Sequence, residues 1–171
     1  MKDSANNVIG FHHVDLVVPD IDGAKTFYMA LLDLELYSES SWDGDNAGFN
    51  QVVGLEQSSA RLCMLKGSNG FLELFEYSSL TGTNAGQSQA NDIGFRHLCV
   101  VVNDVDVALQ RCIELGGSKM NDPYSVTGGA TAVYCRDPYG NLLEMVSPAG
   151  RFPPPFMLSL IHISEPTRPE R

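Results

Sequence analysis

Two histidines and two glutamates occupy corresponding places in a pattern that occurs twice in this 171-residue chain. His13 and His97 lie 84 residues apart, each at the fourth position of an apolar run that opens with Gly-Phe. Glu73 and Glu144 lie in the apolar runs that close the two copies. Imidazole and carboxylate groups bind divalent metal ions and transfer protons. The duplicated set is therefore the first indication of chemistry in this sequence.

The repeat predicts how the chain is organised. Residues 10–24 (GFHHVDLVVPDIDGA) match residues 94–108 (GFRHLCVVVNDVDVA) at a constant offset, and the two copies end alike at residues 70–77 and 140–147. A repeat of this length predicts two modules of one fold. The expected boundaries are a first module over 9–77, a linker over 78–92, a second module over 93–148 and a non-repeat C-terminal tail over 149–171.

The first copy reads as a strand, a helix and further strands. An apolar run over residues 12–18 predicts a strand. Because successive side chains of a strand point to opposite faces, His12 is expected to point away from His13. Asp20 or Asp22 is placed to cap the helix that follows. The same pattern in the second copy predicts a helix capped by Asp104 or Asp106. The helical stripes expected to be buried are Ile21, Ala24, Tyr28 and Leu31, and Val105, Ala108, Cys112 and Leu115.

Other segments are assigned from composition. Residues 38–48 are polar and contain glycine, which predicts a loop, and Trp42 within it is equally compatible with a pocket mouth and with the core. The remaining runs predict strands over 33–37, 49–55, 60–66, 71–77, 95–102, 130–136 and 142–146. Residues 159–171 resemble translated sequencing-adapter read-through and are left out of the fold prediction, His162 included.

The composition narrows the class of protein. A net charge of −10 argues against a nucleic-acid or anionic-membrane surface. The first eight residues contain no apolar signal segment, and no run approaches the roughly 18 residues needed to cross a membrane, so we expect a cytoplasmic protein. The four cysteines have no CxxC spacing, which favours buried reduced thiols over a zinc site. They are Cys63, Cys99, Cys112 and Cys135.

The duplicated βαβββ plan is similar to that of the vicinal oxygen chelate superfamily of glyoxalases, bleomycin-resistance proteins and extradiol dioxygenases. The motifs that carry the resemblance are Phe-x-His-x-x-x-Val-Val-x-Asp-x-Asp-x-Ala and Asp-Pro-Tyr-Gly-Asn-Leu-Leu-Glu, within residues 9–148. The resemblance implies an α+β fold, with two tandem βαβββ modules forming a cup-shaped mixed β-sheet and helices packed outside. It also implies one divalent metal ion, with the ligands His13, Glu73, His97 and Glu144.

The ligand chemistry agrees with this resemblance. Two imidazoles and two carboxylates suit Zn, Ni, Co, Fe or Mn rather than Ca. All four residues lie in apolar strands, where an unpaired charge would be costly. Asp15 shares the face of His13 and is either a hydrogen-bond partner of an imidazole or part of the cup lining. His12 has Arg96 as its counterpart and is expected to be structural or exposed.

The resemblance implies a metal-dependent lyase or isomerase of the glyoxalase or epimerase type. Such an enzyme removes a proton next to a carbonyl of a small substrate with vicinal oxygens and returns it elsewhere. Glu144 is the expected base and ligand, with Glu73 as its symmetric partner. We also expect a homodimer, with the cup formed within one chain or shared between two.

Four alternatives remain open. An Fe(II) extradiol-type dioxygenase would use His13, His97 and Glu144, with Glu73 then occupying a position wanted for substrate. A thiol transferase acting on a fosfomycin-like epoxide would need three protein ligands. A metal-free antibiotic-binding protein, or a metal-bearing accessory module without turnover, represents a different class of protein.

Overall fold

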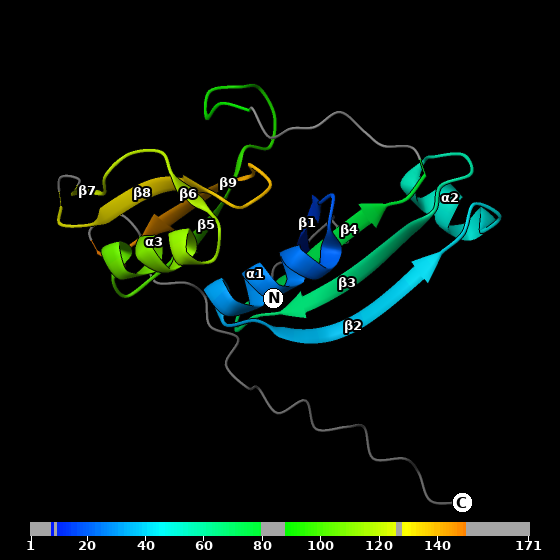
Figure 1. The fold of residues 1–171 in the computed structure, drawn as a ribbon, viewed down its shortest axis with the longest axis horizontal. Coiled ribbons are helices and arrows are strands. Elements are labelled where there is room, and N and C mark those ends of the chain that lie inside the picture. The colour runs from blue at the N-terminus through cyan, green and yellow to red at the C-terminus, as the bar shows by residue number, and fades with distance from the viewer. Residues whose placement is uncertain (1–7, 9, 80–87, 126–127, 150–171) are drawn as a thin grey trace, which may run out of the picture.

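The computed structural model describes residues 8, 10–79, 88–125 and 128–149 (Figure 1). The elements in chain order are β1 (His13–Val17), α1 (Ile21–Leu32), β2 (Glu35–Trp42), α2 (Ala47–Val53), β3 (Ala60–Lys66), β4 (Phe71–Tyr77), β5 (His97–Val101), α3 (Val105–Glu114), β6 (Ser118–Lys119), β7 (Tyr124–Ser125), β8 (Thr131–Arg136) and β9 (Leu142–Val146). None of the helices in these ranges is long and apolar enough to cross a membrane.

The strands form two separate mixed sheets, one for each module. The first has the order β1-β4-β3-β2 and the second has β5-β9-β8-β6, with β7 paired to β8. The pairs β1–β4 and β5–β9 are parallel, and all other pairs are antiparallel. The α+β class and the two βαβββ-like modules are therefore confirmed. In both sheets the first strand of the module, which carries the histidine, lies at an edge.

The helices begin where the sequence predicts. Asp20 accepts a hydrogen bond from the Gly23 amide at 3.1 Å, and Asp104 accepts one from the Val107 amide at 3.0 Å, so each is an N-cap. The helices α1 and α3 each pack their apolar side against the sheet of their own module, and they contact each other near the centre of the molecule (Figure 1). One continuous core therefore runs through both modules.

A buried polar joint holds the two modules together. Tyr28 of α1 donates a hydrogen bond at 2.7 Å to Asp137, which is only 3% exposed and lies in the turn between β8 and β9. Asp137 also accepts bonds from the amide of Tyr139 and from the amide and side chain of Asn141. Burial, and then the charge of Asp137, raise the pKa of Tyr28 well above its usual value. A Cβ at Gly23 would lie 2.5 Å from the Tyr139 hydroxyl, so glycine permits this close approach.

The connection from β2 to β3 differs from the prediction. Residues 38–42, expected as loop, continue β2, because pairing with β3 satisfies the backbone of this polar segment. Residues 49–55, expected as a strand, lie largely in helix α2, which Asn46 caps and Gly54 ends with a positive φ of 69°. Phe49, Val52 and Val53 have helical spacing, which a reading based on their β-propensity overlooks.

Two further expectations are settled by burial. Trp42 is 4% exposed, stacks on Phe49 with ring centroids 4.6 Å apart, and donates to the Ser58 hydroxyl, so it is buried, although it lies outside the main core cluster. All four cysteines are free, and three are buried as expected. The expectation of burial is wrong for Cys99, which is exposed because it lies on the sheet face away from the helix. Most of the predicted linker (80–87) and tail (150–171) lies outside the described residues.

Candidate functional site

His13 and Glu73 form a close pair on the first sheet. The strands β1 and β4 run parallel with Asp15 opposite Glu73, so the histidine lies two residues before the register partner of the glutamate. Its Nε2 is 3.1 Å from Oε2 of Glu73. The Glu73 side chain is 14% exposed and that of His13 is 37% exposed. The pair is therefore open to solvent on the imidazole side and shielded on the carboxylate side.

His97 and Glu144 form the same arrangement on the second sheet. Cys99 lies opposite Glu144 in the parallel pair β5–β9, so the register repeats that of the first module. The separation between Nε2 of His97 and Oε2 of Glu144 is again 3.1 Å, and the Glu144 side chain is 15% exposed. Because the sequence repeat and the parallel register coincide, the two modules present duplicate His–Glu pairs.

The second nitrogen of each imidazole has its own partner. Nδ1 of His13 is 2.8 Å from Nδ1 of His12, which also stacks on Phe71. Nδ1 of His97 is 3.3 Å from the hydroxyl of Tyr134 on β8. A hydrogen bond at Nδ1 fixes the ring and leaves Nε2 available as a ligand, as at protein metal sites. Each Nε2 is thus directed at its carboxylate.

His12 is exposed as expected, but its expected direction needs correction, and His12 fills one of the two roles considered for Asp15. His12 does not point away from His13; it lies just before β1, so the alternation of the strand does not govern it. His12 is the partner of the His13 imidazole, a role that the sequence had also suggested for Asp15. Tyr134 was not identified from the sequence, although the β8–β9 pairing puts it opposite Glu144 on the same face. Only that strand pairing could have revealed it.

Asp15 carries an electrostatic cost on this face. Burial, followed by the negative charge of Glu73, raises its pKa to about 6, and His13 partly opposes the shift. Above that pH the ionised carboxylate is less stable in the metal-free folded chain than in the unfolded chain. Below about pH 4, where both states are protonated, this cost is absent.

Replacing Asp15 with Asn should therefore stabilise the metal-free protein at neutral pH. We expect the melting temperature in chelator to rise by about 2–4 °C at pH 7.5, since solvent screens part of the repulsion. The difference from wild type should shrink as the pH falls from 6 to 4. Thermal unfolding monitored by circular dichroism measures it, with the exposed Asp45→Asn as control. A difference that does not vary with pH would contradict this explanation.

The two His–Glu pairs do not join into one cluster in the described parts of the chain. Across those residues, no group of three or more His, Cys, Asp or Glu side chains is arranged to hold a metal ion. Two surface hollows, of about 620 and 340 Å³, are lined by other residues. The faces with the pairs lie opposite the helices, whereas the modules contact each other through α1 and α3. The chain thus presents two separate half-sites.

The first half-site is bordered by aromatic residues. Phe75 and Tyr77 follow Glu73 on the same face of β4, and their rings stack with centroids 5.8 Å apart. Trp42 makes T-shaped contacts with both rings. This end of the face offers flat apolar surface beside a carboxylate.

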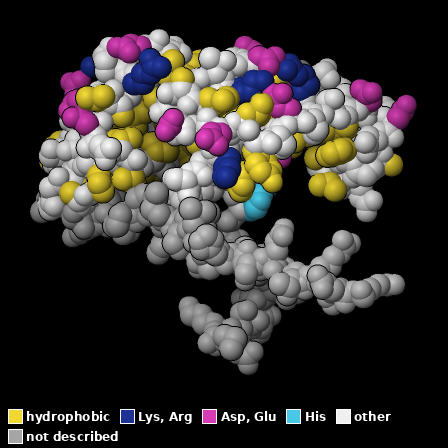
Figure 2. All heavy atoms as spheres, turned by 90° about the horizontal axis from the view of Figure 1, so that it is seen from below, with side chains coloured by type: hydrophobic (Ala, Val, Ile, Leu, Met, Phe, Trp, Pro, Cys, Tyr) yellow, Lys and Arg dark blue, Asp and Glu magenta, His cyan; other side chains and the backbone are white. Residues whose placement is uncertain are grey.

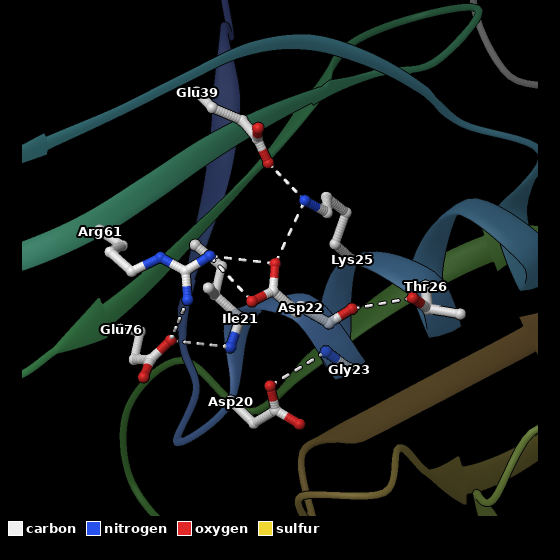
Figure 3. Close-up of polar contacts among 9 residues, drawn as sticks. All are labelled: Asp20, Ile21, Asp22, Gly23, Lys25, Thr26, Glu39, Arg61 and Glu76. Carbon is white, nitrogen blue, oxygen red and sulfur yellow. Dashed lines mark hydrogen bonds and ion pairs between the residues drawn. The ribbon is translucent and has the colours of Figure 1, made fainter.

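The charged cluster of this module lies on the other face of the sheet (Figure 3). Arg61 donates to both carboxylate oxygens of Asp22, at 3.0 and 2.8 Å, and lies 3.4 Å from Glu76. Glu76 also accepts a hydrogen bond from the Ile21 amide at the start of α1. Glu76 of β4 therefore stabilises the N-terminus of α1 and is separate from the pair of His13 and Glu73.

Comparison with known proteins identifies relatives across nearly the whole described fold. A sequence model of the glyoxalase/bleomycin resistance protein/dioxygenase superfamily matches residues 10–145. A 2-epi-5-epi-valiolone epimerase from Actinomyces sp is 31% identical over 150 residues, covering 83% of this chain and 81% of the relative. 

Two solved structures share the fold. A glyoxalase family protein from Bacillus cereus has a TM-score of 0.76 at 20% identity, covering 84% of this chain and 97% of its own. A fosfomycin resistance protein from Listeria monocytogenes, solved with Mn(II) and sulfate, has a TM-score of 0.54 at 18% identity, covering 82% of this chain and 93% of its own.

Proposed function

The chain belongs to the glyoxalase/bleomycin resistance protein/dioxygenase superfamily, and from this premise we propose that it is a metal-dependent epimerase of a small carbonyl compound. The observation that carries the proposal is the duplicated His–Glu pair, with the same 3.1 Å separation in both modules. The 31% identity to an epimerase supports an isomerase activity over the other activities that the sequence analysis considers.

The donor groups of the two pairs fit a divalent ion. Ligand atoms about 2.1 Å from an ion and at right angles to each other lie about 3 Å apart, close to the separation in each pair. His13, Glu73, His97 and Glu144 would together hold one ion of the Zn, Ni, Co, Fe or Mn type. Such an ion would polarise the substrate carbonyl and acidify the neighbouring C–H bond.

The two glutamates account for inversion at that carbon. Epimerisation removes a proton from one face of the carbon and returns a proton to the other, so two acid–base groups on opposite sides suffice. We assign proton removal to Glu144 and proton return to Glu73, with the roles exchanged in the reverse reaction. The half-buried environment of both carboxylates limits access of water to the proton being moved.

The substrate to test first is 2-epi-5-epi-valiolone, because the epimerase related to this chain is named for it. The chain would be incubated with this compound in D₂O, and the products followed by proton NMR. We expect one new epimer, with deuterium at the inverted carbon, and we expect chelator to stop the reaction and a divalent ion to restore it. Absence of both exchange and epimer with each of Zn, Ni, Co, Fe(II) and Mn would overturn the assignment for this substrate.

The other candidate activities receive less support from the geometry. An extradiol-type dioxygenase needs only three of the four residues as ligands, yet Glu73 and Glu144 stand in the same relation to their histidines. A metal-free binding protein would have no need of either pair. The presence of the same His–Glu pair in both modules is explained most simply if all four residues take part in metal binding.

Tyr134 should act as a positioning residue in this account. Its hydroxyl lies 3.3 Å from Nδ1 of His97, and loss of such a partner typically weakens metal binding 10- to 100-fold. We expect Tyr134→Phe to weaken Zn or Co binding about tenfold, measured by competition with a chromogenic chelator. The exposed Tyr124→Phe on neighbouring β7 is the matched control. Equal affinities in the two variants would argue against a role for this hydroxyl.

A further inference from the structure

Cys112 and Cys135 form a pair of thiols in the interior of the second module. Their sulfur atoms are 3.9 Å apart, and both residues are 0% exposed. Cys112 lies near the end of α3 and Cys135 lies near the end of β8, 23 positions apart in the chain. Within the described residues, which include all four cysteines, neither Cys63 nor Cys99 has a second sulfur within hydrogen-bond distance. The structure thus brings one specific pair of thiols together.

The thiol pair lies on the helix side of the second sheet, away from the His–Glu pairs. Successive side chains of β8 point to opposite faces, so Cys135 packs in the core beneath α3 while Tyr134 faces His97. Asp137 follows β8 directly and holds the buried joint with Tyr28. A bond between the two sulfurs would therefore connect α3 to the strand that leads into this joint, without touching the proposed metal ligands.

A glycine turn covers the sulfur of Cys112. A Cβ added at Gly117 would lie 2.5 Å from this sulfur, so the backbone of Gly117 packs directly against it. Gly117 is half-buried and Gly116 before it is exposed, so the thiol lies close below the surface. The amides of both glycines bond to carbonyls in the last turn of α3. Helix ends open locally at a lower free energy than a whole domain unfolds, so a small molecule can reach the thiols while the module stays folded.

The two sulfurs are near enough to join without a change of fold. A disulfide has an S–S distance of about 2.0 Å, so the sulfurs must approach each other by about 1.9 Å. Rotation of each side chain about its Cα–Cβ bond is enough to supply such a movement. We propose that Cys112 and Cys135 are an oxidation site, at which hydrogen peroxide converts the two thiols into a reversible disulfide between α3 and β8.

The reaction has two balanced steps. In the first, the thiolate of Cys112 attacks one oxygen of the peroxide and the O–O bond breaks, which leaves a sulfenic acid and, with the thiol proton, water. In the second, the sulfur of Cys135 attacks the sulfenic sulfur, the S–O bond breaks, and a second water leaves with the other thiol proton. Two thiols lose two electrons and two protons, and one hydrogen peroxide becomes two waters. A hydrogen bond from Cys135 lowers the pKa of Cys112, which favours Cys112 as the thiol that reacts first.

The burial of the thiols and the charge of the surface favour hydrogen peroxide as the oxidant. Figure 2 shows acidic side chains spread over one face of the molecule, and the chain has a net charge of −10. This charge repels oxidised glutathione, which is an anion and is also too large for a buried site. Hydrogen peroxide is small and neutral, so neither effect opposes its entry. It is therefore the probe for the test.

A cysteine map of the wild-type chain tests the proposal. The reduced, folded protein is treated with hydrogen peroxide in the presence of chelator, then denatured in N-ethylmaleimide, digested with trypsin and analysed by mass spectrometry. Each cysteine lies in its own tryptic peptide, and these are residues 62–66, 97–111, 112–119 and 120–136. We expect peptide 112–119 linked to peptide 120–136, and recovery of both free thiols after treatment with dithiothreitol.

Cys63 provides the matched control, because it is also buried but has no sulfur partner among the described residues. We expect it to stay a free thiol in the oxidised wild type, and Cys63→Ser to form the same linked peptides. In Cys112→Ser, Cys135 should lose its link and react with N-ethylmaleimide. Circular dichroism checks that both variants fold, and the map of the wild-type chain does not depend on them.

The disulfide should also stabilise the oxidised chain, because it closes a loop of 23 positions in the unfolded state. We expect the melting temperature of oxidised wild type to exceed that of reduced wild type by about 6–12 °C, with no such rise in Cys112→Ser treated alike. A disulfide that lowers the melting temperature would overturn the proposal, because the bond would then not fit the folded chain.

Two results of the cysteine map would overturn the proposal directly. One is that Cys112 and Cys135 both remain free thiols in the folded chain, at a peroxide dose that fully oxidises N-acetylcysteine in a parallel sample. The other is that the link appears only in urea, or that peptide 120–136 is joined equally to the peptides of Cys63 and Cys99. Either result would show that the folded chain does not present the two thiols as a reactive pair.

Discussion

Replacing Glu144 with Gln should slow deuterium exchange into the substrate by about 10²- to 10⁴-fold, the usual contribution of a positioned acid–base group. The amide keeps the size of the side chain but cannot accept the proton. Only 15% of the Glu144 side chain is exposed, so water is poorly placed to replace it. Proton NMR in D₂O with added metal measures the exchange, and circular dichroism confirms that the variant is folded.

The matched control for this substitution is Glu76→Gln. Glu76 is also a glutamate of a strand next to an edge strand, but it lies on the opposite face of β4 from Glu73, at the start of α1. We expect exchange in this variant to stay close to wild type. Exchange that is as fast in Glu144→Gln as in Glu76→Gln would remove Glu144 from the reaction.

Replacing Asp137 with Ala should lower the free energy of unfolding by about 3–5 kcal/mol. The substitution leaves the Tyr28 hydroxyl and the donors of Tyr139 and Asn141 without their acceptor. Asp137 is 3% exposed, so water does not readily take its place. Because the joint links the two modules, the loss should also appear as weaker coupling between them in hydrogen exchange.

Urea unfolding measures the change, with Asp45→Ala as the control at an exposed position. We expect the control to lie within about 0.5 kcal/mol of wild type. Tyr28→Phe removes one of the bonds to Asp137 and should cost about 1–2 kcal/mol. A loss below 1 kcal/mol in Asp137→Ala would show that the modules do not depend on this joint.

The sequence repeat predicted equivalent strands for the two histidines and for the two glutamates, but not how these strands pair in the sheets. His13 and His97 open equivalent edge strands, and the parallel register of β4 and β9 then places Glu73 and Glu144 beside them. Within each strand, the face that a residue occupies follows from its position in the sequence, because successive side chains point to opposite faces.

The local pattern of polar and apolar residues could not predict the structure of the segment from β2 to α2 or the environment of His13. The polar strand residues 38–42 owe their structure to pairing with β3, which composition does not encode. His12 precedes β1, so its contact with His13 follows from a chain bend rather than from alternation.

The local pattern of residues could not predict the separation of the two His–Glu pairs either. It depends on contacts between residues far apart in the chain, such as Tyr28 with Asp137 and Gly23 with Tyr139. The repeat predicts two equal modules and leaves their mutual packing undetermined. The side chains at their contact decide whether the sheets enclose one site or expose two faces.

The metal content of the purified chain tests the His₂Glu₂ centre most directly. Elemental analysis should be made on wild type and on the Glu73→Gln and Glu76→Gln variants, after reconstitution and removal of loosely bound ions. We predict about one divalent ion per chain in wild type and Glu76→Gln, and marked loss in Glu73→Gln. A wild-type chain that epimerises its substrate without any bound ion, or an ion retained equally by all three proteins, would contradict the His₂Glu₂ centre.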